Sequence, residues 1–345
     1  MSTRHLSFFI RLAWLAVVLA AVVVVLGAYV RLSDAGLGCP DWPGCYGRIT
    51  APREQEKAQV ARRFERPLVV AKAWKEMVHR YVAGLLGLCI AVLGIVAWRN
   101  RRASPQPVGT AVVLLGLVIV QAALGMWTVT WLLKPLVVTL HLLGGMSILS
   151  LCWWLVMRSA RLWCGAGEQF DVGRLRRYRR AVVLAFVLLA AQIALGGWTS
   201  SNYAALACPD FPACHGQWWP NVDFREAFVL WGGIGLDYEG GVLSGPARVA
   251  IHLTHRLGAL VMFLYIVSLA LAVLVDDVAR SQFAGHAVLL LALVVAQVTL
   301  GIANVLAGLP LAVAVAHNAV AAALLLALVA LAHRLWPPAA AAGRG

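Results

Sequence analysis

The sequence predicts an all-α integral membrane protein with eight transmembrane helices. Hydrophobic residues make up 61% of the 345 positions and charged residues only 13%. The hydrophobic residues come in runs of about 20, the length that crosses the hydrocarbon core of a bilayer. Because lipid offers the backbone no hydrogen-bond partner, such runs must be helical. An internal repeat then divides the eight helices into two sets of four.

The first half of the chain contains four of these runs. The first run is too long for the apolar part of a signal peptide and has a counterpart in the second half, so we interpret it as a helix of the mature protein. The expected spans are residues 12–30, 77–98, 109–131 and 136–157.

The second half repeats this pattern after an arginine-rich join near residues 160–180. Its runs follow in the same order, again with one long loop between the first run and the second. The expected spans are residues 181–199, 249–275, 286–307 and 311–332.

Arginines between the spans predict the orientation, because cytoplasmic ends are enriched in Lys and Arg. Both termini are therefore expected in the cytoplasm, with the chain crossing the inner membrane of a bacterial cell. Segments 31–76 and 200–248 then form long outer loops; the first is also basic, but its length and its glutamates weaken that signal. The arginines at the predicted cytoplasmic ends are Arg4, Arg11, Arg99, Arg101, Arg102, Arg174, Arg176, Arg177, Arg179 and Arg180.

These arginines account for most of the net charge of +14. At a cytoplasmic membrane surface, arginines meet the anionic head groups of membrane lipid. We interpret the charge as lipid contact and expect no nucleic-acid partner.

Histidines mark the internal repeat most clearly. His79 and His255 are 176 residues apart, and so are His141 and His317. A Cys-Pro-Asp-aromatic-Pro segment occurs in each outer loop, and Gln-x-x-Leu-Gly occurs three times, at residues 121–125, 192–196 and 297–301. Because four spans return the chain to the same side, we expect two four-helix bundles related by a pseudo-two-fold axis along the membrane normal. The N-terminal bundle covers residues 1–165 and the C-terminal bundle residues 166–345.

The four histidines fall in the outer half of their helices, where a ligating side chain is a functional candidate. The second and fourth helices of each bundle can bring their histidines face to face, as two axial ligands hold a heme iron. Zinc is less well suited, because each pair offers few of the further ligands of a tetrahedral site. For any single histidine, an ordinary hydrogen bond between helices is the alternative. Small residues that follow the histidines leave room for a macrocycle or serve as helix contacts: Ala83, Gly84, Gly144, Gly145, Gly258, Ala259 and Ala319.

One matched position differs between the halves. Glu76 corresponds to His252, and each lies three residues before a proposed ligand. A carboxylate beside a heme edge can accept a proton or position a water, whereas a histidine there would tune the site. We therefore assign the chemistry to the first half and electron transfer to the second.

Arg80 and Arg256 follow the matched histidines and either pair with a heme propionate or extend to lipid head groups.

Two spaced cysteine pairs, Cys39/Cys45 and Cys208/Cys214, lie in the outer loops. The outer face of a bacterial membrane is oxidising, so each pair is expected to form a disulfide. A bridge over so few residues could also be redox-active, and metal binding is the alternative. The remaining cysteines, Cys89, Cys152 and Cys164, are interpreted as small apolar residues.

Four segments of the chain resemble the heme A synthase family, and the resemblance covers nearly the whole sequence. They are Gly-Leu-Gly-Cys-Pro-Asp-Trp-Pro at 36–43, Glu-Met-Val-His-Arg at 76–80, Ile-His-Leu-Thr-His-Arg-Leu-Gly at 251–258 and Ala-His-Asn at 316–318. The resemblance implies an oxidoreductase that oxidises the C8 methyl group of heme O to the formyl group of heme A, with water as the oxygen source.

The resemblance also implies roles for individual residues. It places an electron-transfer heme b on His255 and His317, and the substrate heme near His79 and His141. Glu76 matches the family's essential carboxylate, and the first cysteine pair matches the family's first-loop cysteines. Expected partners are heme O synthase (protoheme farnesyltransferase) and an electron acceptor that the sequence does not name; a homo-oligomer is also allowed.

Two other functions fit the same histidines. One is a diheme membrane cytochrome that only carries electrons, and the other is a heme-binding transport or chaperone protein. The cytochrome predicts two equivalent bis-histidine sites and has no need of Glu76.

Overall fold

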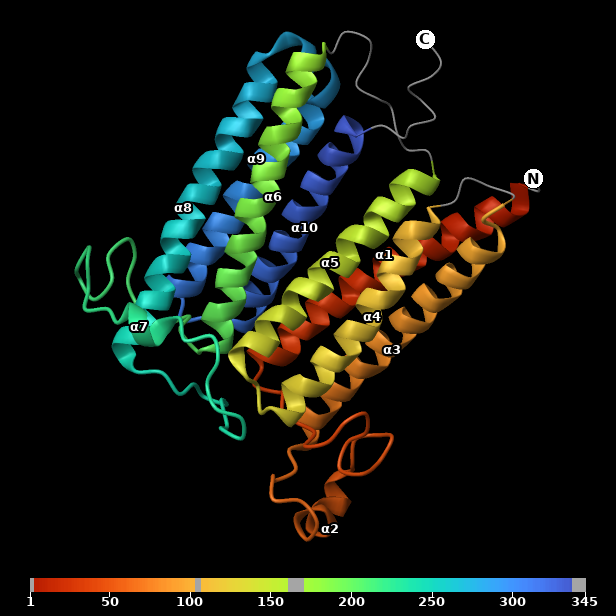
Figure 1. Ribbon diagram of the computed structural model, residues 1–345. Helices are drawn as coiled ribbons and strands as arrows, with labels where there is room; N and C mark the ends of the chain where they lie inside the picture. Colours follow the sequence, from red (N-terminus) through yellow and green to blue (C-terminus); the bar gives the residue numbers. More distant parts are fainter. Residues whose placement is uncertain (1–2, 103–106, 161–170, 337–345) are drawn as a thin grey trace.

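The computed structural model describes residues 3–102, 107–160 and 171–336 (Figure 1). Among these residues, eight helices are long and apolar enough to cross a membrane, which confirms the predicted number of transmembrane helices. Short helical segments lie in the two long loops: η1 (Glu54–Glu56), α2 (Lys57–Ala61) and α7 (Phe224–Ala227). The long helices are α1 (Thr3–Leu32), α3 (Val70–Arg99), α4 (Val108–Thr130), α5 (Pro135–Ser159), α6 (Val172–Ser201), α8 (Gly245–Val275), α9 (Asp277–Leu306) and α10 (Leu311–Leu335).

Several helices begin earlier than the apolar runs predict. Helix α3 starts seven residues before the expected span, so Lys72 and Glu76 lie inside it. Helix α6 starts at Val172 because the carboxylate of Asp171 caps it, accepting a hydrogen bond from Arg174 N at 2.7 Å. Charged residues end an apolar run but do not break helical hydrogen bonding, so the helices continue past the hydrocarbon core.

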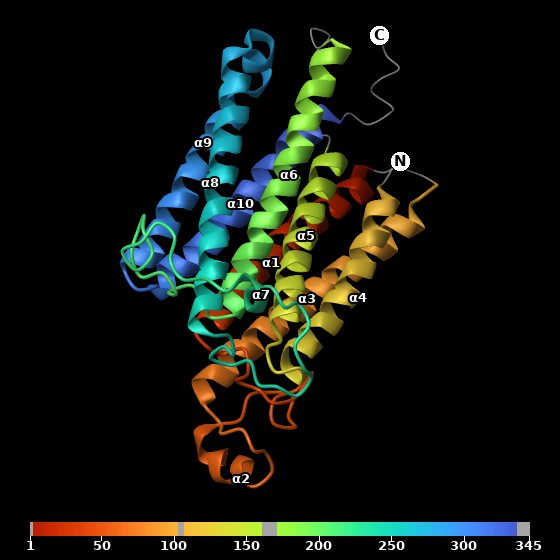
Figure 2. The same cartoon turned by 60° about the vertical axis from the view of Figure 1, so that its left-hand side comes forward.

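The packing of the helices follows their order in the chain. Helix α1 contacts α3 and α5, and α4 contacts the same two helices. In the second half, α8 and α10 each contact both α6 and α9. The halves meet where α5 contacts α6 and where α10 contacts α1 and α5. Figures 1 and 2 show the four long helices of each half lying together, with α5 and α6 side by side between them.

Small side chains allow these helices to pack closely, because lipid supplies no hydrophobic driving force between apolar surfaces. On α1, Ala13, Ala16 and Ala20 are at most 1% exposed and lie one turn apart on a single face. Val18 and Val22 are exposed on the opposite side, where lipid would contact them. The buried face of α1 is therefore the one with the smaller residues.

Both long loops lie at the same end of the molecule, and the α8–α9 connection lies at the other (Figure 1). Ion pairs tie the loops together across the two halves: Arg66 binds Asp237 at 2.9 Å and Glu239 at 2.6 Å. Lys134, at the start of α5, donates to the carbonyl of Gly232 at 2.7 Å. This loop end contains the four candidate ligand histidines and the two cysteine pairs. Residues 161–170 of the arginine-rich join, including Cys164, lie outside the described residues.

Candidate active site

Each of the four predicted ligand histidines packs its ring against a glycine of the preceding long helix. The Cβ atom that each glycine lacks would lie within 3.1 to 3.3 Å of the imidazole Cε1, tighter than ordinary contact. Any side chain at these positions would push the imidazole away. The four contacts are Gly27 with His79, Gly125 with His141, Gly196 with His255 and Gly301 with His317.

These contacts make four similar helix pairs: α1 with α3, α4 with α5, α6 with α8, and α9 with α10. Within each half, the two histidines are electrostatic neighbours, His79 with His141 and His255 with His317. The structure therefore brings together the pairs that the sequence places together.

The donor set fits an axially ligated heme better than a bare metal ion. Among the described residues, no group of three or more His, Cys, Asp or Glu side chains is placed to hold a metal ion. The Nδ1 atoms of His79, His141 and His317 are buried, and within the described part of the chain they have no hydrogen-bond partner. A pair of neighbouring imidazoles with unused nitrogens could hold the iron of one heme in each half.

Glutamine side chains contact three of the histidines, and sequence reasoning assigned them no role. Gln192 Nε2 lies 3.1 Å from His255 Nδ1, and Gln297 Nε2 lies 3.2 Å from His317 Nε2. Gln121 Nε2 donates to the backbone carbonyl of His141 at 2.8 Å. The repeated Gln-x-x-Leu-Gly segment was the available signal, since it places a glutamine one turn before three of the four contacting glycines.

Two of the small residues expected to make room for a macrocycle make room for these glutamines instead. A Cβ atom on Gly144 would lie 1.9 Å from Gln121 Nε2, and one on Gly258 would lie 2.4 Å from Gln192 Oε1. At these two positions the structure fits the alternative prediction, a close contact between helices. Around Gly84 there is open space, with nothing within 4 Å of an added Cβ atom.

Glu76 is buried, with 5% of its surface exposed, at the junction of α3 and the first disulfide loop. Its Oε2 accepts a hydrogen bond from the backbone N–H of Cys39 at 2.9 Å. Its Oε1 accepts from Arg80 Nη2 at 2.5 Å, one helical turn further along. The carboxylate is held by two donors and lies three residues from His79 on the same helix.

His252, the counterpart of Glu76, makes a different contact. Its side chain is 4% exposed, and its Nδ1 lies 2.9 Å from the carbonyl oxygen of Ala204. At the position matched to Glu76, the described part of the second half thus has a histidine and not a carboxylate. The asymmetry inferred from the sequence is therefore present in the hydrogen bonding as well.

Arg80 and Arg256 bind the backbone of the disulfide loops. Arg80 Nη1 donates to the carbonyls of Asp41, at 2.9 Å, and Gly44. Arg256 donates to the carbonyls of Asp210 at 2.7 Å and Ala213 at 2.8 Å, which are the matched positions of the repeat. Both guanidinium groups are engaged in fixing a loop over the helix that carries the first histidine of each pair. Both guanidinium groups bind loop carbonyls in this structure. Pairing of these arginines with a heme propionate stays a prediction.

Both cysteine pairs are disulfides, Cys39–Cys45 and Cys208–Cys214. Each bridge encloses a turn stabilised by an aspartate: Asp210 accepts hydrogen bonds from the backbone N–H groups of His215 at 2.7 Å and Gly216 at 2.8 Å. These donors, chiefly that of Gly216, hold the pKa of Asp210 below its ordinary value. Asp41 binds the equivalent two N–H groups in the first loop. The two loops therefore share one conformation, and the aspartates are structural.

Comparison with known proteins bears on this arrangement. The model of the COX15-CtaA family, described as cytochrome oxidase assembly protein, matches residues 10–329. The chain belongs to the COX15-CtaA family. This confirms the resemblance on which the sequence-based assignment drew.

Relatives of the same family match over most of their length. A heme A synthase of Shewanella oneidensis is 42% identical over 97% of this chain and 99% of the relative. Heme A synthases of Halalkalibacterium halodurans and Rhizorhabdus wittichii are each 28% identical, over 86% and 94% of this chain and 86% and 93% of the relatives. Similarity therefore extends across both halves and both disulfide loops.

Proposed function

We propose that this chain is a heme A synthase that oxidises the C8 methyl group of heme O to the formyl group of heme A, with water as the oxygen source. Its full-length likeness to heme A synthases makes it an oxidoreductase. The observation that carries the assignment of the chemistry is the buried Glu76, held by Cys39 N and Arg80 beside His79. No matching carboxylate stands beside His255.

The proposed architecture is two four-helix bundles, residues 1–165 and 166–345, related by a pseudo-two-fold axis. The matched glycine–histidine contacts and the matched loops, each with its arginine and aspartate, support this arrangement. In the N-terminal bundle His79 and His141 hold the substrate heme. In the C-terminal bundle His255 and His317 hold heme b.

Bound heme b supplies one-electron redox chemistry, by which electrons leave the substrate half. Oxidation of a methyl group to a formyl group with oxygen from water releases four protons and four electrons. The electrons would go to the acceptor, and the N-terminal site needs a proton acceptor. Glu76 has this role, since it is the buried carboxylate nearest in sequence to His79 on α3. Arg80 and the Cys39 N–H orient its two oxygens, so that any shift of the first loop would also shift the acceptor.

The proposed location is the inner membrane of a bacterial cell, with both termini cytoplasmic and with the histidines and disulfide loops toward the outer side. Heme O synthase is the expected supplier of substrate, because heme O is too apolar to travel freely in water. An electron acceptor for the C-terminal half is a further expected partner, and a homo-oligomer is compatible with this assignment.

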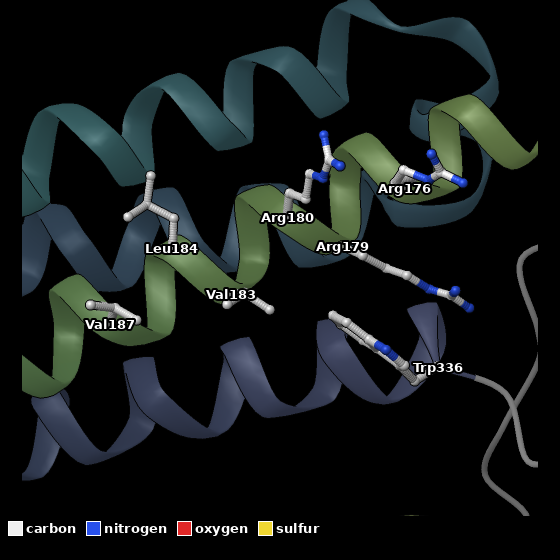
Figure 3. A pocket seen from close by; sticks show the side chains of 7 residues that line it. All are labelled: Arg176, Arg179, Arg180, Val183, Leu184, Val187 and Trp336. Carbon is white, nitrogen blue, oxygen red and sulfur yellow. The ribbon is translucent and has the colours of Figure 1, made fainter.

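Membrane lipid is the expected partner at the arginine-rich end. A groove of about 360 Å³ on α6 and α10 is lined by the residues labelled in Figure 3. Arg176 and Arg180 lie one turn apart on α6, and Val183 and Val187 continue the groove toward the middle of the helix. The arginines at one end of the groove suit the anionic head group of a lipid, and the apolar residues at the other end suit its acyl chain.

A diheme cytochrome is the second candidate, because each half contains a pair of neighbouring histidines. The test is to purify the protein from a host that makes heme O, extract the hemes and separate them by chromatography. A heme A synthase yields heme A, together with a reduced-minus-oxidised spectrum of heme b. A folded protein that contains heme b but never yields an oxidised heme, with an electron acceptor available, would be a cytochrome.

A further inference from the structure

Three of the four histidine sites share a glutamine that the remaining site lacks. Gln121, Gln192 and Gln297 each lie four residues before the glycine that contacts a histidine. The corresponding residue before Gly27 is Val23. Residues four apart lie on the same face of a helix, so each of these side chains is directed toward the same neighbouring helix as its glycine.

The amide oxygens of the three glutamines are unused. Each Oε1 is buried and has no hydrogen-bond partner in the residues that the structure describes. An iron-bound histidine uses one ring nitrogen for the metal and needs an acceptor for the N–H on the other. Gln192 Nε2 lies 3.1 Å from His255 Nδ1 and donates to the His255 carbonyl at 3.0 Å. A half-turn of the amide would bring Oε1 to the ring nitrogen in exchange for the hydrogen bond to that carbonyl. The glutamine can therefore supply the acceptor that an iron-bound imidazole requires.

His79 has no such acceptor. Its Nδ1 is buried without a partner among the described residues, as are those of His141 and His317. What distinguishes His79 is Val23, whose side chain offers no polar atom where the other sites have a glutamine. Among the four sites, the one without a glutamine thus belongs to the helix that also carries Glu76.

We propose that Val23 makes His79 the most exchangeable of the four histidines that would hold heme iron. Gln192 and Gln297 contact the rings of His255 and His317, whereas Gln121 holds the backbone of His141. The inference rests on the proposed function, in which His79 binds the substrate heme. A substrate must enter and a product must leave, while heme b stays bound through many turnovers. Both histidines of the C-terminal half have a glutamine, and only one histidine of the N-terminal half does.

Loss of a hydrogen-bonded partner of a ligating histidine typically lowers metal affinity by about 10–100-fold. We therefore expect Val23→Gln to slow heme release from the N-terminal half by about 10-fold or more. Gln192→Leu should speed release from the C-terminal half by a similar factor. Val22→Gln is the matched control for the first variant, because Val22 is 41% exposed on the outer face of α1 and adds the same amide without facing His79.

The experiment follows heme transfer from the purified, heme O-loaded protein to excess apomyoglobin in mild detergent. The wild type should release heme in a fast phase, from the N-terminal half, and a slow phase, from heme b. Val23→Gln should slow only the fast phase, and Gln192→Leu should quicken only the slow phase. Retention of the slow phase in Val23→Gln shows that the variant is folded.

Equal fast phases in Val23→Gln and Val22→Gln would overturn this inference while leaving the proposed function intact. Gln192→Leu tests the same principle in a half whose heme is resident, so an unchanged slow phase would also contradict it. A wild-type protein that binds heme O in no exchangeable site would instead remove the proposed function itself.

Discussion

The carboxylate of Glu76 and the backbone of Cys39 are joined by a hydrogen bond of 2.9 Å from N to Oε2. Cys39 is also one end of the Cys39–Cys45 disulfide. The position of the proposed proton acceptor is therefore set by a loop closed by a disulfide. In the second half, the matched His252 bonds Ala204, which lies outside the Cys208–Cys214 bridge.

This relationship predicts unequal roles for the two disulfides. Replacing both Cys39 and Cys45 by Ser should lower heme A formation markedly, because the donor that orients Glu76 is no longer held in place. The paired replacement of Cys208 and Cys214 is the matched control and should lower it much less. Heme A yield per heme b measures the difference. Equal losses from the two double variants would show that the bridges act only on folding.

The two loop-binding arginines should differ in their importance for stability. Arg80 and Arg256 both bind loop carbonyls, but only Arg80 also pairs with a buried carboxylate, at 2.5 Å. Removing one partner of a buried pair typically costs about 3–5 kcal/mol, so Arg80→Gln should lower the unfolding temperature more than Arg256→Gln. Thermal unfolding in detergent measures both. A larger effect of Arg256→Gln would argue against a stabilising pair.

Glycine at the histidine contacts should be required for heme binding. A Cβ atom at Gly196 would lie 3.3 Å from His255 Cε1, so Gly196→Ala displaces the ligand and should lower the heme b content. Gly84→Ala adds the same methyl group where nothing lies within 4 Å and serves as the control. The pyridine hemochrome assay on purified protein measures the content. If Gly196→Ala kept full heme b, the contact would not position the ligand.

Acid should loosen the second disulfide loop. Backbone donors hold the pKa of Asp210 below its ordinary value of 3.8. A lowered carboxyl pKa stabilises the folded loop above the ordinary value, and that contribution is lost as the pH falls through the lowered one. Hydrogen-exchange protection of the Gly216 amide should drop in that range, and Asp210→Asn should already reduce it at neutral pH. Asp277→Asn, at the far end of the molecule, should leave it unchanged. Wild-type protection in Asp210→Asn would refute the role given to this carboxylate.

The sequence predicts the eight helices well because span length depends on local apolar runs. It misplaces the start of α3 because Lys72 and Lys75 end the run without ending the helix. The histidine pairs and cysteine pairs follow from spacing alone. Loop carbonyls, however, have no sequence signal, so the partners of Arg80 and Arg256 could not be found. The repeated Gln-x-x-Leu-Gly segment drew attention to Gln192 in the sequence. Its contact with His255, however, depends on how α6 packs against α8.

The central claim is that the two halves are unequal, with Glu76 serving the oxidation and the C-terminal histidines holding heme b. Its most direct test is chromatography of the hemes extracted from purified Glu76→Gln protein, made in a host that supplies heme O, with His252→Gln as the matched variant. Loss of a general base lowers rates by about 100- to 10,000-fold. We predict wild-type heme b and almost no heme A in Glu76→Gln, and heme A still formed in His252→Gln. Normal heme A formation by Glu76→Gln would contradict the assignment.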